Sequence, residues 1–292
     1  MARLVRDLIW AVLGAAGFFG IADAAQPELS LPNQGGPEIV VFGHADGGNE
    51  LSDFIRAVGV ETGEYQLARW HGEICPHVIG LRDELNDYVR ATIETVAQIS
   101  RIGTGERGCR PNLLVVMSDN PARFLETLRE ERPDLFGTLS LPDIDAMIDG
   151  TSSVNLWSLL ETRGSDGRDL DPDTDTLTGV VASRTGRSIR ADFHFRAIIV
   201  DLAQVDDVSM RQLSGLVAML SLAQVDVDSP IRSNRTILNL FHDPANTPDD
   251  ISDWDIAYLR ALYSTDGGDS ADTQRAEMVR VAHERLQGGG SE

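Results

Sequence analysis

The sequence contains no lysine, so its 25 basic residues are all arginine, and 46 acidic residues outnumber them. Without lysine, the chain has no Schiff-base nucleophile and no Ser-Lys catalytic pair. Its formal net charge of −21 repels phosphate backbones and anionic lipids, so we expect neither nucleic acid nor a membrane surface as a partner. An unknown protein or a small molecule remains as the expected partner. We attribute the missing lysine to a GC-rich genome or a salty habitat, and an acidic face for a cationic partner is the alternative.

Several catalytic motifs are missing as well. The sequence has no G-x-S-x-G elbow, no P-loop and no H-E-x-x-H, and no two of its histidines lie three or four residues apart, the spacing at which a helix presents two metal ligands. Three histidines remain as catalytic candidates: His44 near Asp46, His194, and His242 next to Asp243. They could serve a hydrolase only if the fold brought a nucleophile such as Ser118 close. We otherwise expect solvated histidines and no cofactor.

Only two cysteines are present, Cys75 and Cys109. They lack the C-x-x-C spacing of a structural zinc site. Each stands next to a predicted strand, 74–80 or 112–118, and a helix between them would make these strands parallel neighbours. In an oxidising compartment we therefore predict a disulfide, which would stabilise the fold by roughly 3–4 kcal/mol in the chain-entropy model. A free thiol nucleophile and half of a metal site are the alternatives.

The sequence also lacks an apolar run long enough to span a bilayer comfortably, which takes about 20 residues. The uncharged, largely apolar stretch 8–21 follows Arg3 and Arg6 and precedes the small-x-small pattern of Ala22–Ala24. This order is typical of a secretory signal peptide, and a buried N-terminal helix is the alternative. We predict a mature chain that begins at Ala25, has no transmembrane segment, and lies in the periplasm of a Gram-negative bacterium or is secreted.

Strand and helix patterns alternate along the rest of the chain, which predicts an α/β fold with a mixed sheet. The clearest helix is 81–101, where apolar residues recur at spacings of three and four. We expect strands near 38–43, 74–80, 112–118, 154–160, 180–183 and 193–203, and helices near 51–58, 81–101, 209–223, 252–263 and 271–287, with two more that begin at Pro121 and Pro142. The predicted organisation is a signal peptide (1–24), a flexible mature N-terminus (25–37), a single α/β domain (38–264), and a C-terminal helix with a disordered tail (265–292).

One charged loop alternates carboxylates as calcium-binding loops do, with Asp171, Asp173 and Asp175 as the candidate ligands. Counted from Asp171, an EF-hand would have glycine at its sixth position and glutamate at its twelfth. The sequence has Thr176 and Ala182 there, so the EF-hand motif fails. A solvated acidic loop is the alternative to a calcium site.

Several segments resemble a group of uncharacterised exported proteobacterial proteins: Gln66–Trp70 with Cys75–Leu81, Cys109–Val115, Leu216–Gln224 and Ile256–Tyr263. The likeness covers residues 38–264. That group is distantly similar to zincin-like metallopeptidases of bacterial envelopes. The resemblance implies a zincin-like core with packed helices.

In zincin-like peptidases a strand leads into a helix that carries His-Glu and a further ligand one turn later. The histidines hold zinc, and the glutamate takes the proton from the zinc-bound water. The matching helix is 209–223, where the resemblance places Ser214 and Gly215 at the His-Glu pair and Ala218 at the next ligand. No shift of register helps, because this helix contains no His, Glu or Asp. We expect that its small residues form a close-packing face, and that purified protein holds no stoichiometric zinc.

The sequence therefore predicts an exported, non-catalytic envelope protein with a binding or structural role. The alternative is a periplasmic, peptidase-like hydrolase with an unrecognised site of histidines and carboxylates at the strand ends, where α/β proteins place their sites. A histidine grouped with a carboxylate and a serine in one cleft would favour the hydrolase. Histidines on separate surfaces would favour binding.

Overall fold

The computed structural model describes residues 48–60, 66–164, 167–168, 189–205, 207–227, 230–231, 233 and 235–288. One mixed sheet has the strand order β1-β2-β4-β3. Its strands are β1 (Pro76–Ile79), β2 (Leu113–Ser118), β3 (Val154–Gly164) and β4 (Ile189–Asp201). Strands β1, β2 and β4 are parallel, and β3 pairs antiparallel with β4 at one edge. The predicted α/β fold with a mixed sheet is confirmed. The signal peptide, the mature N-terminus and the strands expected at 38–43 and 180–183 lie outside the described residues.

Helix α3 (Asp83–Ile99) connects β1 to β2, which are parallel neighbours as the sequence predicts. Cys75 and Cys109 consequently meet at the amino ends of these strands and form a disulfide, with their Cα atoms 6.0 Å apart. Asn112 links the same two segments, because its side chain accepts a hydrogen bond from the Cys75 N–H at 2.7 Å and donates one to the Glu73 carbonyl at 3.0 Å. The predicted disulfide is confirmed.

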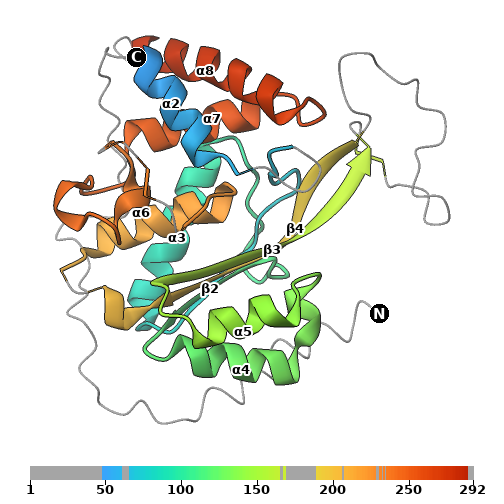
Figure 1. The fold of residues 1–292 in the computed structure, drawn as a ribbon, viewed down its shortest axis with the longest axis vertical. Coiled ribbons are helices and arrows are strands. Elements are labelled where there is room, and N and C mark those ends of the chain that lie inside the picture. Colours follow the sequence, from blue (N-terminus) through green and yellow to red (C-terminus); the bar gives the residue numbers. More distant parts are fainter. Residues whose placement is uncertain are drawn as a thin grey trace.

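Helices cover both faces of the sheet (Figure 1). On one face lie α2 (Gly48–Val58), α3, α6 (Met210–Leu222), α7 (Asp253–Ser264) and α8 (Ala271–Gly288), and on the other lie α4 (Pro121–Glu131) and α5 (Leu141–Asp149). Helix α8 contributes Met278 and Ala282 to the larger core, so the C-terminal helix packs into the same domain. Among the described helices, none is long and apolar enough to cross a membrane.

Local sequence fixes where several helices begin. The hydroxyls of Ser140, Ser209 and Ser252 each accept a hydrogen bond from the backbone three residues later, and the side chain at that position bonds back to the serine N–H. These capping boxes satisfy backbone groups that a helix start leaves unpaired. Helix α4 starts instead with Pro121 behind the capping side chain of Asn120. Single-turn 3₁₀ helices complete the fold: η1 (Pro133–Phe136), η2 (Leu202–Gln204), η3 (Ile237–Asn239) and η4 (Pro244–Asn246).

A β-bulge in β4 decides which face its side chains take. Leu159 pairs with Phe195 and Leu160 pairs with Phe193, so His194 is the extra residue. One extra residue reverses the alternation of side chains along a strand. Phe193 therefore packs in the larger core and Phe195 in the smaller core on the opposite face. The His194 side chain stays in solvent and is 66% exposed.

Helix α6 is buried on all sides, with every residue from Gln212 to Leu222 shielded from solvent. Gly215 lies so close to the next segment that a Cβ atom would be 2.7 Å from the Ile251 nitrogen. The close-packing face predicted for this helix is confirmed at Gly215. Near the end of the helix, Trp70 Nε1, in the chain before β1, donates to the Ser221 carbonyl at 2.8 Å.

Two buried arginines cap helix C-termini. Arg196, in β4, donates to the carbonyls of Leu220 and Ala223 at the end of α6, each at 2.6 Å. Arg69 donates to the last carbonyls of α7 and to the side chain of Gln274 in α8. Cations near a helix C-terminus satisfy its unpaired carbonyls and its dipole. Burial lowers the pKa of Arg196 to about 9 and also lowers the pKa of Arg69.

Candidate functional site

The structure places His194 and His242 at opposite ends of the sheet. His194 lies where β3 and β4 extend beyond the amino end of β2, and His242 lies beside α6, near the residues that precede β3. Ser118, at the carboxyl end of β2, lines neither of the two pockets that contain these histidines. His44 and the calcium candidates Asp171, Asp173 and Asp175 lie outside the described residues.

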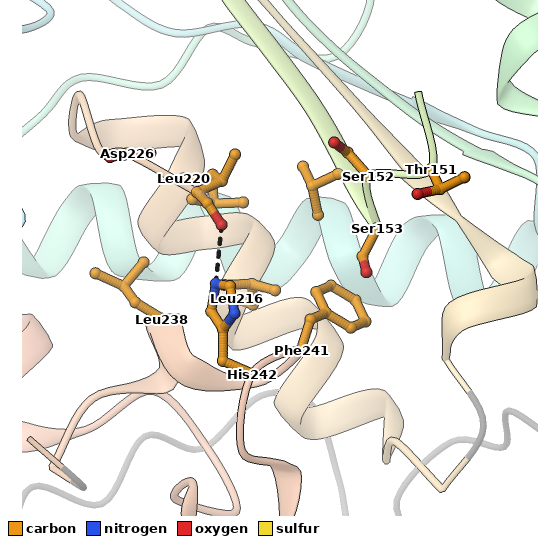
Figure 2. A pocket seen from close by; sticks show the side chains of 11 residues that line it. Thr151, Ser152, Ser153, Leu216, Leu220, Asp226, Leu238, Phe241 and His242 are labelled. Atoms are coloured by element: carbon orange, nitrogen blue, oxygen red, sulfur yellow. Dashed lines mark hydrogen bonds between the residues drawn. The ribbon is translucent and has the colours of Figure 1, made fainter. Parts of the chain in front are cut away.

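The first pocket is at the carboxyl end of the sheet, and we call it the carboxyl-end pocket. Its volume is about 200 Å³. It lies between the chain that enters β3, helix α6 and the loops that follow α6 (Figure 2). Its lining residues are Thr151, Ser152, Ser153, Val154, Leu216, Leu220, Asp226, Val227, Leu238, Phe241 and His242.

A histidine, a carboxylate and serines thus share the carboxyl-end pocket, as the hydrolase alternative requires, but they are not joined into a catalytic group. His242 Nε2 contacts the Val227 carbonyl at 3.1 Å. Figure 2 shows Ser152 and Ser153 across the pocket from the imidazole. Triad chemistry needs a hydrogen bond between the base and the nucleophile, and the described contacts of these serines include none to His242.

The structure also shows which side of α6 faces a pocket. Leu216 and Leu220 line the carboxyl-end pocket, and their i, i+4 spacing is the one at which a helix presents two metal ligands. Ser214, Gly215 and Ala218, which the resemblance places at the peptidase positions, are buried in packing contacts instead. Among the described residues, no three metal-ligating side chains come together.

The second pocket lies at the amino end of the sheet, and we call it the arginine cleft. Its volume is about 590 Å³. The projecting ends of β3 and β4, the chain before β1, the chain before β2 and the residues around η1 form its walls. Its charged lining residues are Arg110, Arg132, Arg163 and Arg190, with Asp134, Glu161 and Asp192, and its histidines are His71 and His194.

Backbone pairing brings His71 into the arginine cleft. Strand β4 extends beyond the start of β2, and Arg69 lies beside this extension in the position that β2 occupies further along. Arg69 forms a parallel bridge with Asp192 there. The Arg69 N–H donates to the Ala191 carbonyl at 3.4 Å, and the Phe193 N–H donates to the Arg69 carbonyl at 2.9 Å. The bridge holds the chain before β1 against the projecting part of β4. His71, two residues further along, therefore reaches Asp192.

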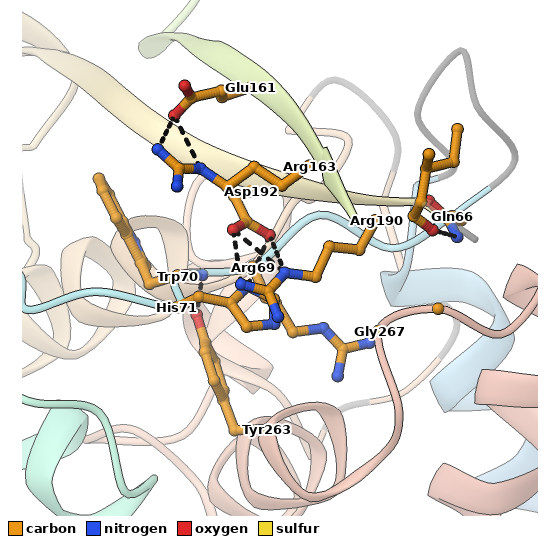
Figure 3. Close-up of polar contacts among 12 residues, drawn as sticks. Gln66, Arg69, Trp70, His71, Glu161, Arg163, Arg190, Asp192, Tyr263 and Gly267 are labelled. Carbon is orange, nitrogen blue, oxygen red and sulfur yellow. Dashed lines mark hydrogen bonds and ion pairs between the residues drawn. The ribbon is translucent and has the colours of Figure 1, made fainter. Parts of the chain in front are cut away.

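Asp192 is the most buried carboxylate of the described lining of the arginine cleft (Figure 3). His71 Nδ1 lies 2.7 Å from one carboxylate oxygen, and Arg190 Nε donates to the carboxylate at 3.0 Å. Burial by itself raises the pKa of Asp192, but the hydrogen bonds from His71 and Arg190 outweigh it, so the net pKa is lowered. Asp192 thus stays ionised and orients the imidazole of His71.

Two further pairs complete the lining. Glu161 accepts a hydrogen bond from Arg163 at 2.9 Å and lies 3.7 Å from His194 Nδ1. Arg132 donates to Asp134 through Nε at 2.8 Å and through Nη2 at 2.6 Å, and this two-point contact raises the pKa of Arg132 and lowers that of Asp134. Both carboxylates therefore have an arginine partner.

Sequence reasoning missed the arginine cleft. Its lining residues come from separate segments, and neither His71 nor Asp192 belongs to a motif. One signal was present: Arg190, Asp192 and His194 alternate with apolar residues in a segment that turned out to be strand.

The sequence also contains the glycine pattern G-x-G-x-x-G at 103–108, but this pattern lies between helix α3 and strand β2. A dinucleotide-binding loop requires the reverse order, from strand to helix.

Comparison of the chain with protein-family models, with curated proteins and with solved structures gives no match.

Proposed function

We propose that this protein is an exported, non-catalytic binding protein of the bacterial envelope, and that it holds a small molecule in the arginine cleft. The observation that carries the proposal is the cleft itself: about 590 Å³ at the amino end of the sheet, lined by charged side chains on a rigid scaffold. Volumes of about 300–1,000 Å³ are typical of small-molecule sites. The carboxyl-end pocket, at about 200 Å³, is below that range.

The surroundings of the cleft support a preformed site. The disulfide at Cys109 fixes the segment that carries Arg110, and the bridge at Arg69 fixes the segment that carries His71. The aromatic residues Trp70, Phe193 and Phe195 also line the cleft and are almost fully buried in the two cores. A site held by packed neighbours binds without a large ordering cost.

The proposal includes a zincin-like core that has lost its metal. Strand β4 leads into helix α6, in the order that the resemblance implies. The peptidase positions on α6 are filled by small residues in close contact with neighbouring chain, and its pocket-facing pair is two leucines. Leucine side chains offer no lone pair to a metal, which agrees with a binding role.

The test is native mass spectrometry of protein purified from periplasm without denaturation. We expect a small-molecule adduct on the wild-type protein. Gly72 lines the cleft, and a Cβ there meets nothing within 4 Å, so Gly72→Trp should fill the cleft and remove the adduct. Gly72→Ala should retain it, and so should Thr151→Trp, which obstructs the carboxyl-end pocket instead. An adduct that survives Gly72→Trp and disappears with Thr151→Trp would reject the arginine cleft as the binding site.

A second candidate function is hydrolysis at the same cleft, favoured by the His71–Asp192 pair. A carboxylate that fixes the tautomer of a histidine is the usual arrangement for a general base. The described lining has no Ser, Thr or Cys, so His71 would have to activate water. Turnover of p-nitrophenyl phosphate or p-nitrophenyl acetate that disappears in His71→Gln, but not in His194→Gln, would establish this alternative over the binding role.

A further inference from the structure

The charge of the arginine cleft is opposite to that of the chain. The whole sequence has a formal net charge of −21. Among the described residues, the lining of the cleft has four arginines against three carboxylates, before any charge on its two histidines. A basic cleft in an acidic protein concentrates negative ligands locally, because field lines focus in a concave site with low-dielectric walls.

Each of the three carboxylates that the structure describes in the lining already has a cationic partner. Asp134 is bound by Arg132, Glu161 by Arg163, and Asp192 by Arg190 together with His71. Figure 3 shows the last two groups side by side along the projecting strands. These carboxylates are therefore not free acceptors for a cationic ligand. What remains for a ligand is hydrogen-bond donors.

Arg132 provides one such donor. Its side chain is only 5% exposed, and its Nε and Nη2 atoms donate to Asp134. Its Nη1 is buried and has no hydrogen-bond partner. A buried guanidinium N–H without an acceptor is an unsatisfied group that a ligand oxygen can complete.

Arg110 provides a second cation. It lines the cleft, is exposed, and forms no ion pair or hydrogen bond through its side chain in the described part of the chain. The adjacent disulfide and Asn112 anchor its backbone. Guanidinium groups match the geometry of carboxylate and phosphate oxygens better than any other side chain does.

We infer that the arginine cleft binds its ligand through an oxyanion, a carboxylate or a phosphate group, which accepts hydrogen bonds from Arg132 Nη1 and Arg110. This inference rests on the proposed function, since it names the chemistry of the ligand in the same cleft. A small molecule fits better than a nucleic acid or an anionic membrane, because the net charge of the chain repels both of these large polyanions.

The test is isothermal titration of the mature protein with three probes at low salt: inorganic phosphate, succinate and glucose. We expect at least one anion to bind and glucose not to bind. Affinity for that anion should fall about tenfold or more in Arg110→Gln, as for the loss of a charge-assisted hydrogen bond. Arg107→Gln is the matched control, because Arg107 is exposed in the same loop and lies outside the lining. It should bind as the wild type does.

Phosphate and succinate distinguish the two sources of the oxyanion. Arg132→Lys keeps the charge but loses the planar fork, so it should weaken binding while circular dichroism shows an intact fold. If the Arg132→Lys variant does not fold, the affinity of Arg110→Gln for the anion still tests the inference. Glucose binding as tight as either anion, no binding of either anion, or equal affinity in Arg110→Gln and Arg107→Gln would overturn the oxyanion inference. If the native adduct is a neutral molecule and is lost in Gly72→Trp, the binding function is supported and the oxyanion inference is rejected. If the adduct is retained in Gly72→Trp, both the binding function of this cleft and the oxyanion inference are rejected.

Discussion

At the amino end of the sheet, arginines, histidines and carboxylates surround a cleft of about 590 Å³, whereas at the carboxyl end a pocket of about 200 Å³ is lined by hydroxyls, leucines and one histidine. Open α/β sheets usually bind ligands at the carboxyl ends of their strands. Here α6 and the loops after it pack closely over that end. At the amino end, β3 and β4 project beyond β2, and within the described part of the chain a short segment around Arg69 lies beside them.

Two aspartates, one buried and one half-buried, show the same contrast in electrostatic terms. Asp192, at the amino end, has a lowered pKa because hydrogen bonds from His71 and Arg190 outweigh its burial. Asp250, next to the segment that packs on α6, has a pKa raised to about 6 by burial, and its nearest cation, Arg211 Nε, is 3.6 Å away. Burial acts in the same direction on both carboxyls. The number and distance of cationic partners decide the net shift.

The largest expected effect comes from breaking the link between the two regions. Arg196 joins β4 to the end of α6 and also donates to Ser158 Oγ at 2.6 Å. We expect Arg196→Gln to lower the free energy of unfolding by about 3–5 kcal/mol, because buried carbonyls lose their partner. Urea denaturation measures this loss. Arg129→Gln, at a half-exposed ion pair with Asp145, should cost less than about 1 kcal/mol, and equal losses for the two variants would contradict the prediction.

The disulfide tests the amino end alone. Replacing Cys75 and Cys109 together by serine should cost about 2–4 kcal/mol, because the unfolded chain loses a cross-link over 34 residues. Thermal unfolding with and without dithiothreitol measures the effect. The reductant should lower the melting temperature of the wild type and leave that of the double variant unchanged. A wild-type chain indifferent to the reductant would count against a stabilising bridge.

A pair of glycine substitutions compares the packing of the two ends directly. At Gly215 a Cβ would be 2.7 Å from the Ile251 nitrogen, whereas at Gly72 a Cβ meets nothing within 4 Å. We expect Gly215→Ala to lose about 1–3 kcal/mol by overpacking and Gly72→Ala to change stability by less than about 0.5 kcal/mol. Chemical denaturation of both variants is the measurement. The reverse order would mean that the carboxyl end is the looser of the two.

The smallest expected effect is a pH dependence that separates the two aspartates. The folded-state pKa of Asp250 is raised, so the folded protein binds the extra proton, and stability should increase by about 1 kcal/mol between pH 7 and pH 5 through this group. Asp250→Asn should lose that increment. Asp192 has a lowered pKa, so its contribution is present at neutral pH and is lost only as the pH falls into the acid range. Unfolding free energies of wild type and Asp250→Asn, measured at pH 5 and pH 7, test the sign. The same change in unfolding free energy between the two pH values in both proteins would refute it.

Much of the fold could be predicted because its signals are local. The periodicity of 81–101 predicted α3, Pro121 predicted the start of α4, and apolar runs marked β1 and β2. The segment 193–203 predicted too short a strand, since β4 already begins at Ile189. Polar side chains obscure the first residues of that strand. The bulge at His194 also reverses the alternation of side chains along the strand, so the residues on either side of the bulge do not follow one continuous alternating pattern.

The candidate site could not be predicted in the same way. The four arginines of the cleft are at positions 110, 132, 163 and 190, each in a different element or loop. The sequence singles out His44, His194 and His242 as candidates. His71, which has a buried carboxylate partner, is not among them. Its partner Asp192 is 121 positions away in the sequence, and only the bridge at Arg69 brings them together.

The sequence by itself determined the alternation of strands and helices, the cysteine pair, the helix starts and the absence of His, Asp and Glu from α6, because each depends on residue type and short-range spacing. Tertiary structure decided where charge gathers. Composition describes an acidic protein that should repel anions, but the fold places arginines from distant segments around one cleft, where each carboxylate of the described lining is paired with an arginine two positions away in the sequence. Coulomb interactions depend on distance in space rather than on distance along the chain, so a local excess of positive charge is visible only after the chain has folded.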